Sequence, residues 1–319
     1  MSVRILSGSD IRRLLPMGDC IDAMAEVLAS LARDELYNPL RSIIFPPGEK
    51  TGMGLMPSFR SGDRAAYALK AIVVAPENRS RGLDSHQGFV ALFDGVTGVP
   101  KALLDASTIT EIRTAAVSGV ATRLLARPES KTLAILGAGT QARSHLEAMR
   151  EVLPIEHVRA WSRTPGSVAE LDGVEGVGSA EDAIRGADVV VTATAAREPI
   201  VERGWLGDGT HVNAVGSSIK TTRELDTATV VASSLFVDRR ESTFNEAGDY
   251  LFPLQEGAIG PDHIKGEIGE VLIGAVEGRR SDSELTLFKS LGIGVEDLAA
   301  AELVVARAAA EGVGVEVDL

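Results

Sequence analysis

The sequence predicts an α/β protein, and its composition and patterning support that class. Hydrophobic residues make up 45% of the 319 residues and aromatic residues only 4%, so the core must be built mainly from Ala, Val, Ile and Leu. The 33 glycines favour close packing of helices on a parallel sheet. From residue 132 onward, apolar strand-like runs alternate with helical patterns, which is typical of parallel strands joined by right-handed crossovers.

The first part of the chain predicts one helix followed by a mixed or antiparallel sheet. Apolar residues at helical spacing predict the helix over residues 9–35, with Pro16 as an alternative first turn. Short β-rich runs separated by turn residues then predict strands at 41–45, 52–56, 67–74 and 88–94.

The rest of the chain predicts a second domain and a return to the first. A capping box from Thr108 to Glu111 predicts the start of a helix that ends before Pro128. Strands are then expected at 132–136, 157–162, 189–194, 211–215 and 235–238, and helices at 140–152, 180–185 and 296–310. We expect the last helix to pack on the first domain. Residues 1–118 with 296–319 would then form one domain, and residues 119–295 the other.

The charge and the rare residue types exclude several classes of partner. Lys and Arg total 32 against 45 Asp and Glu, and a net charge of −13 disfavours nucleic acid and anionic membrane surfaces. Cys20 is the only cysteine and the five histidines lack ligand spacing, so neither a disulfide nor a metal site is predicted. The N-terminus lacks the apolar core of a signal peptide and no apolar run is long enough to span a membrane, so we expect a cytoplasmic protein.

The most specific motif is a glycine-rich turn between a predicted strand and a predicted helix. In this G-x-G-x-x-A pattern Gly137 permits the tight turn, Gly139 lets the backbone approach a pyrophosphate, and Ala142 allows close helix packing. The free N–H groups at the helix start would bind the phosphates. We therefore predict a Rossmann dinucleotide-binding domain. Its turn would contact the cofactor through Gly137, Ala138, Gly139, Thr140, Gln141 and Ala142.

The residues after the next predicted strand favour NADP(H) over NAD(H). An NAD site usually has a carboxylate about 20 residues after the glycine turn, to bind the ribose hydroxyl. Here the segment reads Ser162-Arg163-Thr164, whose hydroxyl and guanidinium groups can bind a 2′-phosphate. We predict that these residues contact that phosphate, with NAD(H) as the less favoured cofactor. The alternative for Arg163 is a solvated residue at a strand end.

Several further segments, spread over nearly the whole chain, form a specific set in their order and spacing. They are Pro39-Leu-Arg41, Leu55-Met56-Pro57, Lys70 followed by Pro76-Glu-Asn78, Arg113-Thr-Ala-Ala116, Asn213-Ala-Val-Gly216, Arg223-Glu-Leu225 and Thr286-Leu-Phe-Lys-Ser-Leu-Gly292. With the glycine turn, this set resembles the ornithine cyclodeaminase/mu-crystallin family. The resemblance implies a Rossmann domain plus a discontinuous α/β domain that binds substrate and forms a homodimer.

The resemblance also implies roles for individual residues. Arg41, Lys70 and Arg113 would hold the α-carboxylate of the substrate, and two guanidinium forks with an ammonium suit that group. Lys70 lies in an otherwise apolar run, so we expect it to be buried, with a lowered pKa, and to act as proton donor. The alternative for each cation is a structural ion pair with Asp or Glu. Met56 and Ser85 would contact the substrate, and His86 is a second candidate acid. Further cofactor contacts are expected from Thr194, Val215, Gly216 and Ser290.

Two departures from the cyclodeaminases bear on the reaction. Ser218 stands in the place of their catalytic aspartate, and Gly54 in the place of a glutamate near the amino end of the substrate. Cyclisation of ornithine needs carboxylates to handle the amine and its protons, whereas reduction of an imine needs one hydride and one proton. The sequence therefore predicts an NAD(P)H-dependent reductase of cyclic imino acids, with Ser218 as part of the site. The alternatives are an ornithine cyclodeaminase, an alanine dehydrogenase-like enzyme, and a non-catalytic protein that binds NADPH and a small ligand.

Overall fold

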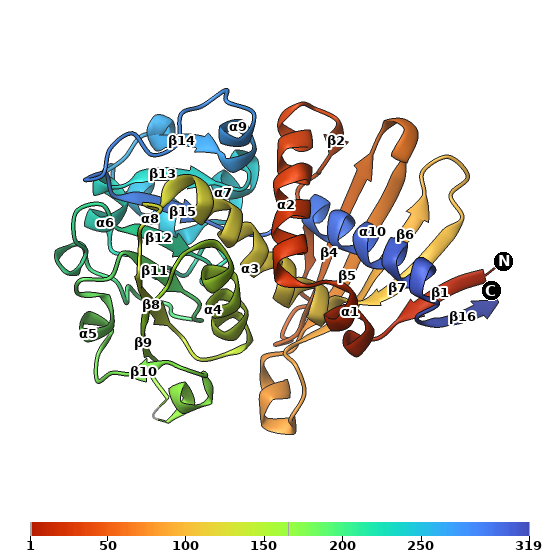
Figure 1. Ribbon diagram of the computed structural model, residues 1–319, viewed down its shortest axis with the longest axis horizontal. Coiled ribbons are helices and arrows are strands. Elements are labelled where there is room, and N and C mark those ends of the chain that lie inside the picture. Colours follow the sequence, from red (N-terminus) through yellow and green to blue (C-terminus); the bar gives the residue numbers. More distant parts are fainter. Residues whose placement is uncertain (1, 165, 319) are drawn as a thin grey trace. The chain divides into compact units, whose positions relative to one another are not determined.

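A computed structural model describes residues 2–164 and 166–318 (Figure 1). The chain divides into two compact units. Unit 1 comprises Met1–Arg113 and Gly292–Leu319, and unit 2 comprises Thr114–Leu291. The predicted limits of independent domains, at 118/119 and 295/296, stay a prediction. The described residues include no helix that is both long and apolar enough to cross a membrane.

Unit 1 contains a mixed sheet, as the sequence predicts. In the described part of the chain this sheet has eight strands, in the order β16-β1-β7-β6-β5-β4-β2 with β3 paired to β4. Only the β1–β7 pairing is parallel among those described. The strands are β1 (Ser2–Leu6), β2 (Leu36–Tyr37), β3 (Ser42–Ile44), β4 (Gly52–Arg60), β5 (Ala66–Val74), β6 (His86–Asp94), β7 (Pro100–Asp105) and β16 (Val315–Asp318).

The two faces of this sheet differ. Helix α10 (Gly294–Glu311) packs on β4, β5 and β6, and α2 (Met17–Ala32) packs on α10 (Figure 1). The opposite face carries several large apolar side chains that are exposed. They include Ile44, Met53, Tyr67 and Phe89, which the strand register places on one side of the sheet. Unit 1 therefore has one covered face and one open apolar face.

The single helix predicted over residues 9–35 is wrong, because two helices occupy this segment. Helix α1 (Gly8–Leu14) begins with a capping box between Ser7 and Asp10, and α2 starts directly after Pro16. Proline lacks the N–H group that a continuous helix would need at this point, and its ring clashes with the backbone carbonyl one helical turn earlier. The apolar periodicity continues across the break, which is why the pattern alone suggested one helix.

Helix α3 (Ala106–Leu125) starts earlier than predicted. The N–H of Thr108 donates to the carboxylate of Asp105 at 2.7 Å, so Asp105 caps the helix and Thr108 lies inside it. The capping box predicted at Thr108 is therefore wrong. An aspartate three residues ahead of a backbone N–H satisfies the same group equally well.

Unit 2 has an all-parallel sheet in the order β10-β9-β8-β11-β12-β15-β13-β14, which confirms the predicted parallel class (Figure 1). Its strands are β8 (Thr132–Leu136), β9 (His157–Trp161), β10 (Glu175–Gly176), β11 (Val189–Thr192), β12 (His211–Ala214), β13 (Ser234–Val237), β14 (Ile264–Glu267) and β15 (Thr286–Lys289). Its helices are α4 (Thr140–Val152), α5 (Ala180–Ile184), α6 (Thr227–Ala232), α7 (Arg240–Glu246), α8 (Gly248–Gln255) and α9 (Ile268–Leu272).

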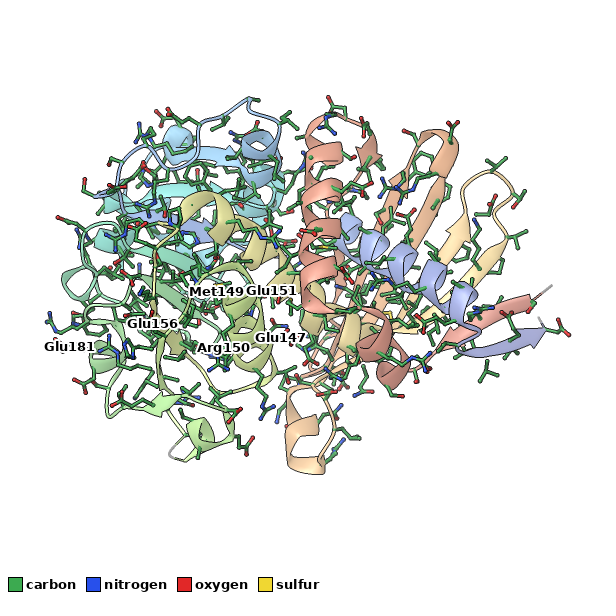
Figure 2. The ribbon with its side chains drawn as sticks, viewed as in Figure 1. Glu147, Met149, Arg150, Glu151, Glu156 and Glu181 are labelled. Atoms are coloured by element: carbon green, nitrogen blue, oxygen red, sulfur yellow. The ribbon has the colours of Figure 1, made fainter. Side chains whose placement is uncertain are left out.

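Helix α4 shows how the amphipathic pattern orients a helix on this sheet. Its Met149 is fully buried, and the Thr122 hydroxyl lies 3.4 Å from the Met149 sulfur. Its neighbours Glu147, Arg150 and Glu151 are exposed (Figure 2). The helix that follows the glycine turn is thus held by its apolar side, and its first turn lies at the carboxyl end of β8.

Candidate functional site

Lys70 lies in the middle of β5, on the covered face of the unit 1 sheet. Its register partners are Met56 on β4 and Val90 on β6, and all three side chains are buried. Only 1% of Lys70 is exposed. A charged group at this depth requires a counterion.

The counterions come from the first turn of α10. The Lys70 Nζ lies 2.8 Å from one carboxylate oxygen of Asp297 and 3.0 Å from the other. Arg113, which is 4% exposed, donates to Glu296 at 2.6 Å and to Asp297 at 3.1 Å. Asp297 therefore links both cations, and two positive and two negative side chains form one buried cluster. We call Lys70, Arg113, Glu296 and Asp297 the clamp cluster.

The sequence reasoning missed both carboxylates of the clamp cluster. Acidic residues in the first turn of a helix are common because they suit the helix dipole, so Glu296 and Asp297 were not distinguished from ordinary helix starts. The available signal was their context, since both lie in the otherwise apolar run from Val295 to Ala301. The structural ion pair, which was the alternative for each cation, is present for Lys70 and Arg113. Their binding of a substrate carboxylate stays a prediction.

Two features of the cluster affect its chemistry. Burial and, next, the charge of Arg113 lower the pKa of Lys70 to about 8, although Asp297 and Glu296 oppose both effects. Gly292 has a φ of +77°, and a Cβ there would lie 2.4 Å from a guanidinium nitrogen of Arg113. The backbone at Gly292 thus packs directly against the guanidinium of Arg113.

The other predicted substrate contacts have different surroundings. Met56 is opposite Lys70 in the sheet, so the structure brings these two together. Arg41 is half-buried between β2 and β3, and its place beside the cluster stays a prediction. Ser85 and His86 contact each other, with the hydroxyl oxygen 3.1 Å from Nδ1, at the start of β6. The roles of Ser85 and His86 also stay predictions.

The glycine turn in unit 2 has the conformation that its pattern predicts. Gly137 has a φ of +123°, and a Cβ there would lie 2.5 Å from the Ala193 carbonyl oxygen. Gly139 caps α4, and a Cβ there would meet no described atom within 4 Å. Ala142 is fully buried, whereas Gly139 and Thr140 are exposed. The first N–H groups of α4 are thus accessible for an anion.

The remaining predicted cofactor residues follow the strands of unit 2. Ser162, Arg163 and Thr164 come after β9, with Arg163 and Thr164 exposed. Thr194, Val215 and Ser290 follow β11, β12 and β15, which are adjacent in the sheet. Gly216 touches the Thr194 segment, since a Cβ at Gly216 would lie 2.2 Å from the Thr194 carbonyl oxygen. Ser218 is half-buried in the loop that follows.

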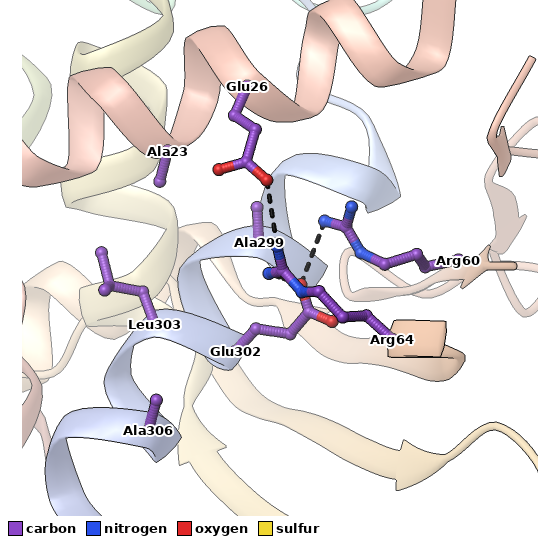
Figure 3. A pocket seen from close by; sticks show the side chains of 8 residues that line it. All are labelled: Ala23, Glu26, Arg60, Arg64, Ala299, Glu302, Leu303 and Ala306. Atoms are coloured by element: carbon purple, nitrogen blue, oxygen red, sulfur yellow. Dashed lines mark hydrogen bonds and ion pairs between the residues drawn. The ribbon is translucent and has the colours of Figure 1, made fainter. Parts of the chain in front are cut away.

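One pocket lies in unit 1 (Figure 3). It is lined by residues of α2 and α10, by Arg60 at the end of β4 and by Arg64 in the turn that follows, and its charged side chains pair with one another. Arg60 lies 3.0 Å from Glu302, and Arg64 lies 3.0 Å from Glu26. No predicted site residue is among those described as lining it. The described residues also contain no group of three or more His, Cys, Asp and Glu side chains that could hold a metal ion.

Comparison with known proteins gives a consistent result. The model of the ornithine cyclodeaminase/mu-crystallin family matches residues 2–312. The chain is 36% identical to a Δ1-pyrroline-2-carboxylate reductase of Bacillus cereus, over 98% of this chain and 99% of that protein. It is 39% identical to the ketimine reductase mu-crystallin of Mus musculus, over 84% of each.

Solved structures resemble it equally closely. The Δ1-pyrroline-2-carboxylate reductase of Thermococcus litoralis, in complex with NADH and L-proline, has a TM-score of 0.96 and 38% identity, covering 99% of this chain and 100% of that one. An archaeal alanine dehydrogenase dimer with bound NAD has a TM-score of 0.94 and 31% identity, covering 100% of each chain. The similarity thus extends over both units.

Proposed function

Because the chain belongs to the ornithine cyclodeaminase/mu-crystallin family, we propose that it is an NAD(P)H-dependent reductase of cyclic imino acids. The substrates are Δ1-pyrroline-2-carboxylate or Δ1-piperideine-2-carboxylate, and the products L-proline or L-pipecolate. The single observation that carries this proposal is the buried ammonium of Lys70, held within 3.0 Å of Asp297 in a chain similar over nearly its whole length to imine reductases.

The proposed reaction needs one proton and one hydride. A nicotinamide cofactor supplies the hydride to the C=N carbon when it is bound. Lys70 supplies the proton to the imine nitrogen, and a pKa of about 8 makes it a stronger acid than an exposed lysine. Arg113 and Arg41 bind and orient the carboxylate. Glu296 and Asp297 offset the buried positive charge that would otherwise destabilise the empty site.

The cofactor site is proposed in unit 2. The first turn of α4 binds the pyrophosphate, and the carboxyl ends of β11, β12 and β15 take the nicotinamide half. A preference for NADP(H) is supported by Ser162-Arg163-Thr164, where an NAD site would have a carboxylate. The Thermococcus relative binds NADH, so the preference is proposed for this chain from its own loop.

A second candidate function is an amino-acid dehydrogenase. The archaeal alanine dehydrogenase favours it, because that structure covers 100% of this chain. The residues argue against it. Ser218 cannot act as a free base at neutral pH, and oxidation of an amino acid requires its ammonium group to lose a proton. The missing carboxylate at Ser218 also disfavours an ornithine cyclodeaminase, and Gly54 stands where a cyclodeaminase has a second carboxylate.

We also propose that the protein forms a homodimer in the cytoplasm. The open face of the unit 1 sheet is apolar, with Tyr67 50% exposed and Phe89 44% exposed. An apolar face across several strands marks an interaction surface, and a twofold axis lets the same face cover itself.

A turnover assay tests the proposed activity. Cyclic imines would be supplied with NADPH, L-ornithine with release of ammonia measured, and L-alanine with NAD⁺ or NADP⁺. The expected result is NADPH oxidation with a cyclic imine and little turnover with either amino acid. Cofactor binding without turnover of any imine would instead support a non-catalytic binding protein.

A further inference from the structure

A second buried charge cluster lies in unit 2, away from the clamp residues in the sequence. Its members are Glu224, Asp249 and Lys289, which are 0%, 2% and 1% exposed. Lys289 lies 2.9 Å from Asp249 and donates to the Gly216 carbonyl oxygen at 2.6 Å. Asp249 accepts the backbone N–H groups of Glu224 and Leu225 at 2.7 and 2.9 Å. The cluster thus binds backbone as well as side chains.

Glu224 connects the cluster to the loop after β11. One of its oxygens accepts the Thr194 N–H at 2.8 Å and the Thr194 hydroxyl at 2.7 Å. The other accepts the Thr192 hydroxyl at 2.6 Å. Gly216 fits against the same carboxylate, because a Cβ there would lie 2.4 Å from it. A single side chain therefore holds the Thr194 segment, and Lys289 holds the Gly216 segment.

The cluster lies at the carboxyl ends of three strands of the parallel sheet. Its partners Thr194 and Gly216 follow the carboxyl ends of β11 and β12, and Lys289 is the last residue of β15. These three strands are adjacent and lie on the other side of β8 from β9. In an open parallel sheet a dinucleotide lies across this edge, with its pyrophosphate at the glycine turn. With the adenosine end at β9, the nicotinamide half lies over β11, β12 and β15.

Stability alone gives little reason for such a cluster. Burial of charged groups is costly, and well-packed apolar residues often stabilise a core as well as an ion pair does. Burial also raises the pKa of Glu224, which shows how unfavourable its environment is for a carboxylate. What the three residues provide is a fixed geometry of two loops, which are further joined by the Ser217 hydroxyl donating to the Ala196 carbonyl at 2.5 Å.

We propose that Glu224, Asp249 and Lys289 are positioning residues for the nicotinamide half of the cofactor. They hold the backbones of Thr194 and Gly216 in the arrangement that receives the nicotinamide ribose and ring. The proposal rests on the proposed dinucleotide function, and it assigns to this cluster no contact with the substrate or the reacting atoms. Loss of the cluster should weaken binding of the nicotinamide half and leave binding of the adenosine half unchanged.

A matched control residue lies in the same sheet, at the amino ends of the strands instead of their carboxyl ends. Asp188, which precedes β11, also accepts two backbone N–H groups, from Lys131 and Thr132, and pairs with Arg127 at 2.6 Å. Its bonding therefore resembles that of Asp249, but it lies at the amino ends of the strands. Asp249→Asn and Asp188→Asn each remove one charge from a carboxylate that has the same kinds of partner, namely two backbone N–H groups and one cation, although Asp188 is 24% exposed and Asp249 only 2%.

The experiment measures two dissociation constants for each full-length variant, one for NADPH and one for adenosine 2′,5′-bisphosphate, which represents the adenosine half. Asp249→Asn should raise the NADPH constant by about tenfold, because the Thr194 and Gly216 segments are then no longer fixed in the arrangement that receives the nicotinamide half. It should leave the constant for the bisphosphate within about twofold. Asp188→Asn should leave both unchanged while lowering the melting temperature. Glu224→Gln, which keeps the shape of the side chain, repeats the test if Asp249→Asn does not fold.

Three other results would contradict the positioning role of Glu224, Asp249 and Lys289. Equal weakening of both ligands in Asp249→Asn, or the same NADPH effect in Asp188→Asn, would show that the cluster only stabilises the fold. Unchanged NADPH binding in a folded Glu224→Gln or Asp249→Asn would also overturn the proposal. If the wild-type protein binds neither NADPH nor NADH, the assignment of a dinucleotide function fails, and this inference fails with it. If it binds NADH alone, the same comparison is made with NADH and adenosine 5′-monophosphate.

Discussion

At the scale of single residues, the environment of Lys70 determines what its ammonium can do. The side chain is buried between Met56 and Val90 and held by Asp297, so its orientation is restricted on every side. The same burial, together with the charge of Arg113, lowers its pKa to about 8, where a lysine can lose a proton during turnover near neutral pH. Asp297 keeps the group protonated against burial and against Arg113.

Replacement of Asp297 should change the pH dependence of the reaction. The acid must be protonated, so kcat/KM should fall as the pH rises through the pKa of Lys70, which is about 8. Asp297 raises that pKa, so Asp297→Asn should move the basic limb of the profile to lower pH. Glu302→Gln, at a carboxylate of the same helix that pairs with Arg60, is the control and should leave the limb in place. A basic limb that does not move in Asp297→Asn would exclude Lys70 as the acid.

Arg163 is predicted to bind the 2′-phosphate of NADP(H). Arg163→Ala should raise the KM for NADPH by about 10- to 150-fold, the equivalent of ~1.5–3 kcal/mol for a charge-assisted hydrogen bond. The KM for NADH should hardly change, because NADH lacks the phosphate. Steady-state kinetics with both cofactors and one imine checks this. An equal effect on the two cofactors would mean that Arg163 does not contact the phosphate.

Ser218 is predicted to limit the range of reactions. The wild type should reduce cyclic imines but should release little ammonia from L-ornithine, because a positioned acid–base group is worth ~10²–10⁴-fold in such steps. Ser218→Asp restores a carboxylate and should increase ammonia release, although Gly54 still leaves the second carboxylate missing. Wild-type cyclisation at rates comparable to imine reduction would contradict this explanation.

At the scale of secondary-structure elements, the fold was predictable where pattern and turn chemistry agree. The bounds of β8 and α4 match the prediction at every residue, because an apolar run, a glycine turn and an amphipathic helix follow directly. Strand β15 was not predicted, because Thr286–Lys289 is short and ends in a charge whose partners lie far away in the sequence. Glu296 and Asp297 were missed for the same reason: their role depends on Lys70 and Arg113, which pattern alone cannot bring together.

The turn before α10 offers a test of how an element positions the clamp cluster. Gly292→Ala should destabilise the fold by about 1 kcal/mol through its positive φ and should raise the KM for the imine, because the added methyl displaces Arg113. Gly312→Ala, at the other end of α10, has a similar φ of +67° and no described atom within 4 Å of the added Cβ. This control should lose stability alone. A KM that rises equally in both variants would refute the positioning role of Gly292.

At the scale of the whole molecule, the open sheet face of unit 1 and the net charge of −13 have opposite effects on association. The charge keeps copies of the chain apart at long range, whereas the face favours one close contact.

The homodimer is testable on this face. The wild type should sediment as a dimer at micromolar concentration, and Tyr67→Glu or Phe89→Glu should shift it to a monomer, because a buried charge without a partner is costly. Val96→Glu, at an 85% exposed position in the turn between β6 and β7, adds the same charge and should remain a dimer. A monomeric wild type would contradict the prediction.

The discontinuity of unit 1 has a consequence for how the protein is made on the ribosome. Lys70 and Arg113 are synthesised long before Glu296 and Asp297, and β1 pairs with β16, the last strand, through Ser2 opposite Asp318. Until α10 emerges, the two cations lack their carboxylates and one face of the sheet lacks its covering helix. Unit 2 is contiguous and can fold during translation, whereas unit 1 must wait until residues 292–319 have been synthesised. A chain truncated before residue 294 and released from the ribosome should therefore be protease-resistant in unit 2 only.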